Sequence, residues 1–144
     1  MKSALYENDF FAWSREQAEL LRAGQLGQAD IEHIAEEIHD MGVSQRKELQ
    51  SRLEVLLQHL LKWQLQPGLR GSSWRDTIDV QRFEISESLD DMPSLRPVLA
   101  TRLSKVYRGA VFKASKETKI PKASFPAYCP FTIEQILDEE FYPE

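Results

Sequence analysis

Residues 30–65 read DIEHIAEEIHDMGVSQRKELQSRLEVLLQHLLKWQL, and this stretch decides the fold. Its apolar and small residues recur every three or four positions, which places them on one face of an α-helix. This stripe consists of Ile31, Ile34, Ala35, Ile38, Gly42, Gln45, Leu49, Leu53, Leu56, Leu60 and Trp63. The stripe keeps its phase throughout, so a continuous helix would be about 54 Å long, and the sequence leaves open whether it continues through Gly42. Gly42 is the position where a bend or interruption is expected.

The second half of this stretch carries a wider apolar surface than the first. Leu57, Leu61 and Leu65 form an additional apolar edge beside the stripe. A helix with two apolar sides is expected to contact neighbouring helices on both of them. This half is therefore expected to lie in the middle of a helical bundle.

Helical patterns also occupy the rest of the chain. Further helices are predicted to begin at Asn8 or Asp9, at Ser72 or Ser73, and at Ser94, which are favoured N-cap residue types. On the helix after Ser72, Gln81 is expected within the apolar face and Arg82 at its edge. The short connections between these helices favour antiparallel neighbours.

The C-terminal part of the chain is predicted to be irregular and then briefly helical. Three prolines make residues 120–131 a segment of coil. Thr132 and Gln135 have the spacing of a capping box for a short helix within residues 132–140. The whole pattern predicts an all-α, antiparallel four-helix-bundle-like fold with one long central helix and a short C-terminal helix. We expect a single domain over residues 1–144, with the C-terminal segment packed on it.

Composition narrows the class of protein. The chain has 144 residues, a formal net charge of −5 and one cysteine, so it is expected to fold without disulfides in a reducing compartment. The N-terminal MKSALYENDF lacks the apolar run of a secretory signal. No apolar stretch approaches the ~20 residues that a membrane span needs. We expect a cytoplasmic protein without a membrane partner.

Charge is distributed unevenly along the chain. Between Arg102 and Lys122 there are seven basic residues and one acidic residue, Glu117. One interpretation is a basic patch for an anionic partner. The favoured interpretation is a basic helix that pairs with the chain's own acidic N-terminal part or tail. Nucleic acid is disfavoured as a partner because the whole protein is acidic.

The run HIAEEIHD, residues 33–40, is the candidate metal site. His33 and Glu37 stand one helical turn apart, and helical bundles build metal sites from such imidazole and carboxylate pairs. The candidate ligands are His33, Glu36, Glu37 and, brought in by the fold, His59. The run lies mostly opposite the apolar stripe, however, so a solvated charged face without a bound cofactor is favoured over a divalent metal.

A second cluster combines polar and aromatic residues at the centre of the chain. Polar groups that are half-buried between helices must find hydrogen-bond partners, so they form either a structural network or the lining of a ligand pocket. The network is favoured. The candidate residues are Arg52, His59, Lys62, Trp63, Trp74, Gln81 and Arg82.

Several motifs together resemble a known family. They are YENDFFAW, AEEIHDMG, SRLEVLLQHLLKWQLQP, SSWRDTIDVQR and CPFTIEQILDEEFYP, in this order from Tyr6 to Pro143. The chain resembles the bacterial family catalogued as domain of unknown function twenty-nine. The resemblance implies an α-helical bacterial protein without an established activity, so it assigns no catalytic residue. The family motif matches here at Glu36, Glu37, His59, Leu60, Leu61, Lys62, Trp63, Trp74 and Arg82.

The sequence does not determine a function. It contains no Gly-rich phosphate loop, paired-cysteine motif, nucleophile elbow or HExxH helix. We therefore favour a non-enzymatic protein–protein interaction or regulatory module, with another protein or a second copy of the chain as its partner. Aromatic residues that follow the prolines are possible anchors for a partner or for the bundle itself. These residues are Phe125, Tyr128, Phe131, Phe141 and Tyr142. The alternatives are a metal-dependent helical-bundle enzyme with His and Glu ligands, and weak nucleic-acid binding through the basic fourth helix.

Overall fold

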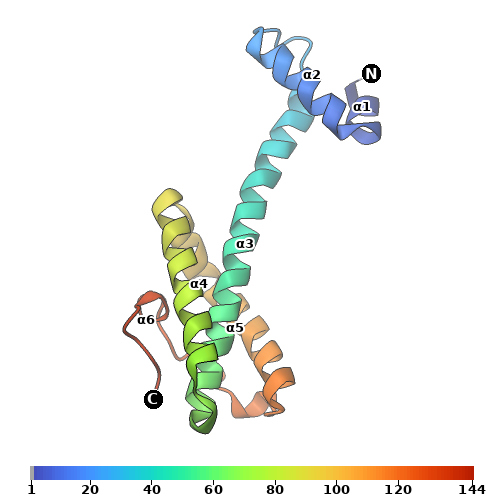
Figure 1. Cartoon of the computed structure of the whole chain (residues 1–144). Coiled ribbons are helices and arrows are strands. Elements are labelled where there is room, and N and C mark those ends of the chain that lie inside the picture. The colour runs from blue at the N-terminus through green and yellow to red at the C-terminus, as the bar shows by residue number, and fades with distance from the viewer. Residues whose placement is uncertain (1) are drawn as a thin grey trace. The chain divides into compact units, whose positions relative to one another are not determined.

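The computed structural model describes residues 2–144, and the side chains from residue 5 onward (Figure 1). The elements in this range are α1 (Lys2–Asn8), α2 (Phe10–Arg22), α3 (Ile31–Leu65), η1 (Pro67–Leu69), α4 (Ser72–Asp91), α5 (Leu95–Thr118), η2 (Lys122–Ser124) and α6 (Ile133–Leu137). Residues 2–144 contain no strand. The predicted all-α fold with a long central helix and a short C-terminal helix is confirmed. Helix α1 was not predicted.

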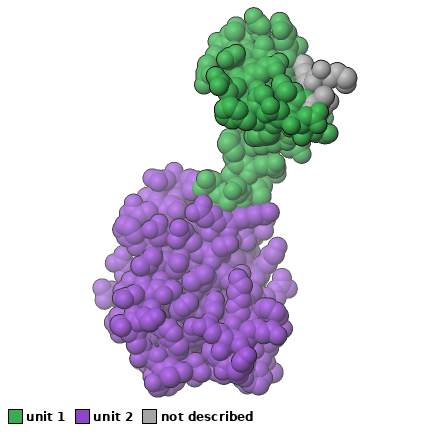
Figure 2. All heavy atoms as spheres, turned by 45° about the vertical axis from the view of Figure 1, so that its right-hand side comes forward, with its two compact units in different colours: residues 1–45 green, residues 46–144 purple. Residues whose placement is uncertain are grey.

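Helix α3 runs through Gly42 without interruption, which the sequence left open. The chain nevertheless divides into two compact units, residues 1–45 and residues 46–144 (Figure 2). The boundary between them falls within α3. The single-domain organisation stays a prediction. No helix in the described part of the chain is long and apolar enough to cross a membrane.

The second half of α3 is the centre of the core of residues 46–144. Both of its apolar edges are buried, and helices α4 and α5 run alongside this half (Figure 1). The fully buried side chains of α3 are Leu53, Leu56, Leu57, Leu60 and Leu61. Helices α4, α5 and α6 contribute Ile78, Ile85, Leu99, Ala110, Ala114 and Ile136, all of which are likewise fully buried. The predicted contact of this half from two sides is confirmed.

The inner face of α4 differs from the predicted one by one position. Arg82 is fully buried, whereas Gln81 is half-buried. The Arg82 Nε–H donates to the carbonyl oxygen of Ile136 at 2.8 Å, and the guanidinium lies 5.3 Å from the ring centre of Tyr142. A short helix such as α6 leaves its last carbonyls without intrahelical partners. Arg82 is drawn inward because it satisfies one of them, although its burial lowers the pKa of the guanidinium.

The C-terminal segment packs on the bundle from which it emerges. The predicted capping box of α6 is present, with the Thr132 and Gln135 side chains each accepting from the other residue's backbone N–H. Phe131 is buried, and Tyr142 donates its hydroxyl hydrogen to Asp79 Oδ1 at 2.8 Å. Most of the aromatic candidates for partner anchors are therefore used internally. Tyr128 differs from them in being 86% exposed.

Within residues 1–45, the face of α3 that is buried is not the expected one. The apolar stripe was expected to face the core, yet Ile31 and Ile38 are 51% and 60% exposed. Asp30 is buried instead. Its Oδ2 accepts from Trp13 Nε1 at 3.1 Å and from His33 Nδ1 at 2.8 Å. This polar network, rather than the stripe, sets how α3 meets α2.

The network extends through the stacked rings of Tyr6 and His33. Their ring centres are 4.0 Å apart, and the Tyr6 hydroxyl donates to Glu37 Oε1. That hydrogen bond raises the pKa of Tyr6 to about 12. His33 and Glu37, which were expected on a solvated face, are consequently half-buried. Glu36 is exposed, as expected.

We expect Leu61→Ala to destabilise the protein by about 2–5 kcal/mol, because it leaves a cavity at a fully buried position. Urea unfolding followed by circular dichroism measures this change. The matched control is Leu69→Ala, since Leu69 is 63% exposed and its truncation should change stability by less than about 0.5 kcal/mol. Equal losses in the two variants would contradict the assignment of the core.

Candidate functional site

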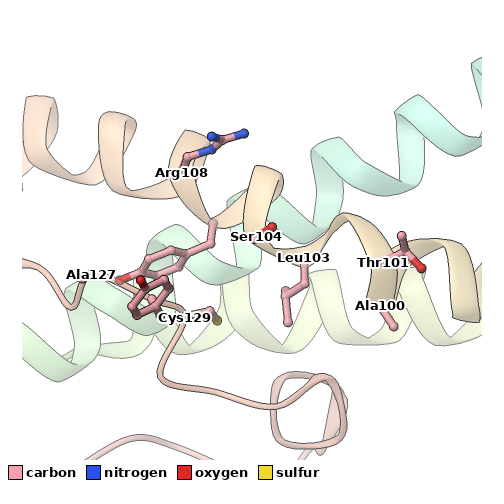
Figure 3. Close-up of a pocket in the computed structure, with 9 residues that line it drawn as sticks. Ala100, Thr101, Leu103, Ser104, Arg108, Ala127 and Cys129 are labelled. Atoms are coloured by element: carbon pink, nitrogen blue, oxygen red, sulfur yellow. The ribbon is translucent and has the colours of Figure 1, made fainter.

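Two neighbouring hollows lie between α5 and the segment that returns along it. The first has a volume of about 460 Å³ and is lined by residues between Ala100 and Arg108 and by Ala127–Cys129 (Figure 3). The second has a volume of about 430 Å³ and extends to Phe112 and Lys122. Because the two share lining residues, we treat them as one surface. We call it the α5 groove, formed by the exposed side of residues 100–112 and by residues 122–129.

The return of the chain along α5 follows from local interactions. Lys119 has a φ of 66° and caps α5 in the left-handed conformation. The Ser115 hydroxyl donates to the carbonyl of Ile120 at 2.6 Å. Further along, the Tyr107 hydroxyl donates to the carbonyl of Pro126 at 2.5 Å. Tyr107 is buried, and burial raises its pKa to about 12, so the hydroxyl keeps its proton and holds the returning segment in place.

The groove combines an apolar lining with cations at its rim. Phe112 is 48% exposed, and the Lys122 ammonium lies 4.6 Å from the centre of its ring. Exposed Tyr128 stands at the other end. Arg108 lines both hollows, and its guanidinium points away from Cys129 (Figure 3). Burial raises the pKa of the Cys129 thiol, which therefore contributes to the lining as a neutral group.

The positive charge around the groove has few partners within residues 46–144. Of the seven basic residues from Arg102 to Lys122, Lys113 alone forms an ion pair there, with Glu54 of α3. Glu117, the acidic residue of this stretch, binds Lys62 instead. Within residues 46–144, no ion pair joins this helix to the acidic tail. Pairing with the acidic N-terminal part and binding of an anionic partner both stay predictions.

The residues of the predicted polar and aromatic cluster form contacts with other residues inside the protein. Lys62 is 3% exposed, and its Nζ donates to Glu117 Oε1 at 2.7 Å while lying 4.8 Å from the ring centre of Trp74. Gln58 donates to the other oxygen of Glu117 at 2.7 Å. The hydrogen bond from Lys62 lowers the pKa of Glu117. These contacts fit the favoured structural network.

The remaining members of the cluster have partners of their own. Arg52 donates to Gln81 at 3.4 Å, which joins α3 to α4. The ring of Trp63 packs 4.9 Å from that of Tyr142, centre to centre. His59 donates its Nδ1–H to the carbonyl of Val55 at 2.8 Å, and burial lowers the pKa of its imidazole. The structure thus joins these residues to neighbouring elements and does not bring all seven to one cavity.

The four candidate metal ligands are divided between the two units. His33, Glu36 and Glu37 belong to residues 1–45, whereas His59 belongs to residues 46–144. Among the described residues, no group of three or more His, Cys, Asp and Glu side chains is placed to hold a metal ion. The metal site stays a prediction without a matching geometry.

The groove residues Tyr107, Arg108 and Phe112 were not singled out from the sequence. The signal that points to them is an apolar aromatic residue, Phe112, within the most basic stretch and outside the apolar stripe of its helix. The pairing of this helix with residues 122–129 depends on the tertiary fold. Sequence spacing alone does not reveal it.

Fold and site together define an all-helical protein with an open apolar groove bordered by cations. The chain belongs to the family described as Domain of unknown function DUF29, whose model matches residues 5–142. The resemblance noted in the sequence is thereby confirmed. No curated protein and no solved structure matches the chain.

We expect Glu117→Ala to destabilise the protein more than Lys62→Met does. Removing the carboxylate leaves the buried ammonium of Lys62 unpaired, at a cost of roughly 1–3 kcal/mol. Replacing the lysine by methionine keeps the apolar stem and leaves a carboxylate that is half exposed to water. Chemical unfolding of both variants measures the difference. A larger loss in Lys62→Met would contradict this account.

We expect His33 and His59 to titrate on opposite sides of the ordinary histidine pKa of about 6.5. The hydrogen bond to Asp30 raises the pKa of His33, so its contribution to stability is lost as the pH rises through that pKa. Burial lowers the pKa of His59, so its contribution is lost as the pH falls below about 6.5. Imidazole NMR titration, assigned with His33→Gln and His59→Gln, gives both values. A pKa of His33 below that of His59 would contradict the environments described for both side chains.

Proposed function

We propose that this protein is a non-enzymatic interaction module that binds an acidic, amphipathic segment of a protein in the α5 groove. The observation that carries the proposal is an exposed apolar lining that lies next to cations without ion-pair partners within residues 46–144. Phe112 supplies apolar surface, and Arg108 and Lys122 supply charge beside it.

The chemistry of the groove favours a protein segment over nucleic acid. Phosphate backbones are recognised mainly by dense positive charge, with binding that weakens steeply as salt is added. Here the lining is largely apolar, including Leu103, Val111 and Phe125. Apolar side chains of an amphipathic helix fit such a groove, while its acidic residues meet the rim. Aromatic side chains and arginine are the residue types that most often anchor protein interfaces.

The internal role of the polar cluster supports the non-enzymatic part of the proposal. Lys62, His59 and Arg82, which are the side chains best suited to acid–base or anion chemistry, are each engaged in structural contacts. A cytoplasmic location belongs to the same proposal. The single cysteine is consistent with a reducing compartment.

Selection of random 15-residue peptides displayed on phage against the immobilised full chain tests the proposal. We expect peptides with Asp or Glu and with apolar residues three or four positions apart, binding in the micromolar range. Synthetic versions should bind Phe112→Asp at least about tenfold more weakly, a loss of about 1.4 kcal/mol. Phe83→Asp is the matched control, because Phe83 on α4 is exposed to 56%, against 48% for Phe112.

Two outcomes would contradict the proposal. Selected peptides that bind Phe112→Asp as tightly as the wild type would place the binding surface elsewhere. Failure to select peptides, combined with salt-sensitive binding of a labelled DNA duplex that Arg108→Glu abolishes, would favour nucleic acid as the partner.

A further inference from the structure

We propose that the α5 groove binds the N-terminal half of α3 from a second copy of this chain, so that the protein self-associates head to tail. This inference rests on the proposed function and names the partner. The segment in question is residues 31–41, which we call the α3 stripe. Its defining feature is an apolar helix face that points to solvent.

The α3 stripe has the pattern of an anchor for a groove. Ile31, Ile38 and Met41 are 51%, 60% and 62% exposed, and Ile34 is half-buried. Their positions repeat at three- and four-residue intervals, which aligns them on one face of the helix. The α1 and α2 contacts of this unit use Asp30, His33 and Glu37 on the adjoining side of the helix. They leave the side that carries the more exposed stripe residues open within the unit.

The charges of the two surfaces are complementary. Residues 1–45 contain nine acidic and three basic side chains, whereas residues 102–122 contain one acidic and seven basic. Glu32, Glu36 and Asp40 are exposed on the same helical segment as the stripe. Opposite charges steer such surfaces together and select the register between them.

The same charges argue against a symmetric contact between two stripes. Pairing stripe with stripe would bring two acidic units against each other, and like charges across an interface are unfavourable. Stripe-to-groove pairing instead places the acidic unit beside the basic helix. It is therefore the arrangement that the charge distribution favours.

The lengths of the two surfaces also match. Residues 31–41 span ten helical steps, or about 15 Å. Residues 100–112 of α5, which line the groove, span twelve steps, or about 18 Å. One groove thus accommodates the three exposed anchors of one stripe. A contact of this size lies at the low end of specific interfaces, so micromolar affinity is expected.

The arrangement has a consequence for the kind of assembly that forms. Each copy offers both a stripe and a groove, and these are different surfaces. Such contacts close into a reciprocal dimer, in which each stripe fills the groove of the other copy, or continue as larger rings or open chains. Average mass should therefore rise with concentration to at least that of a dimer.

Sedimentation equilibrium of the full chain between about 5 and 500 µM tests the proposal. We expect Ile38→Asp and Phe112→Asp each to weaken association at least tenfold. Ile38 is 60% exposed and Phe112 48%, so both variants should retain the fold, which circular dichroism checks. The matched controls Leu26→Asp in the first unit and Phe83→Asp on α4 replace residues that are 59% and 56% exposed, and should associate as the wild type does.

Mixing the two variants gives the decisive measurement. The Phe112→Asp chain keeps an intact stripe and the Ile38→Asp chain keeps an intact groove, so an equimolar mixture should form a one-to-one dimer with the affinity of the wild-type contact. The dimer should not grow further, because its remaining stripe and groove are both disabled.

Other outcomes would overturn the inference. One is a wild type that stays monomeric at 500 µM, and another is a mixture of the two variants that stays monomeric. A third is association that survives Phe112→Asp while Ile38→Asp abolishes it. The last is an equal loss of association in the control variants. If the wild type is monomeric but displayed peptides still bind the groove, the proposed function stands and only the identity of the partner is wrong. If neither association nor peptide binding depends on Phe112, both proposals fail.

Discussion

Burial of the second half of α3 is the constraint on which the main unit depends. Five leucines of this half are fully buried, from Leu53 to Leu61, and they form two adjacent apolar edges. One helix cannot cover both edges, so α4 and α5 are needed on different sides. Transfer of this surface from water is the largest favourable contribution to the fold. The tail then closes the core with Phe131 and Ile136.

Burial of apolar surface does not by itself determine which elements meet and in which orientation. Buried polar groups determine this. Arg82 pairs with a carbonyl of α6, Lys62 with Glu117, and Asp30 with Trp13 and His33. A buried polar group without a partner is costly, so each pair restricts which elements can meet and in which orientation. The polar residues that the sequence singled out as candidates for ligand or metal binding therefore serve mainly to specify structure. The exposed apolar and basic side chains that remain for binding lie instead along the outer side of α5.

The α5 groove is a consequence of how the chain leaves the bundle. After the left-handed cap at Lys119, the prolines keep the chain irregular, and Tyr107 ties it to α5 through the carbonyl of Pro126. An irregular segment cannot cover a helix as completely as another helix does. Hollows remain on both sides of the contact, and the basic residues of α5 border them. Residues 1–45 carry an exposed apolar helix face beside acidic side chains, and residues 46–144 carry an apolar groove beside basic ones.

The sequence by itself determined the helical class and the capping box of α6, because these depend on interactions between residues close in the chain. It left open whether α3 continues through Gly42 and whether Asn8 or Asp9 caps α2, and the structure shows an unbroken α3 and a cap at Asp9. It did not determine which face of α3 is buried before Gln45, since apolar periodicity cannot foresee a polar network centred on Asp30. The sequence likewise placed Arg82 at the edge of the apolar face of α4. The carbonyl that accepts from its guanidinium is 54 residues away in the chain, so the local spacing of residues does not predict it. The groove arises between residues 100–112 and 122–129, and only the tertiary structure brings these together. Contacts between distant segments depend on the packing of the whole chain, and that is the physical reason why the fold class was predictable and the candidate site was not.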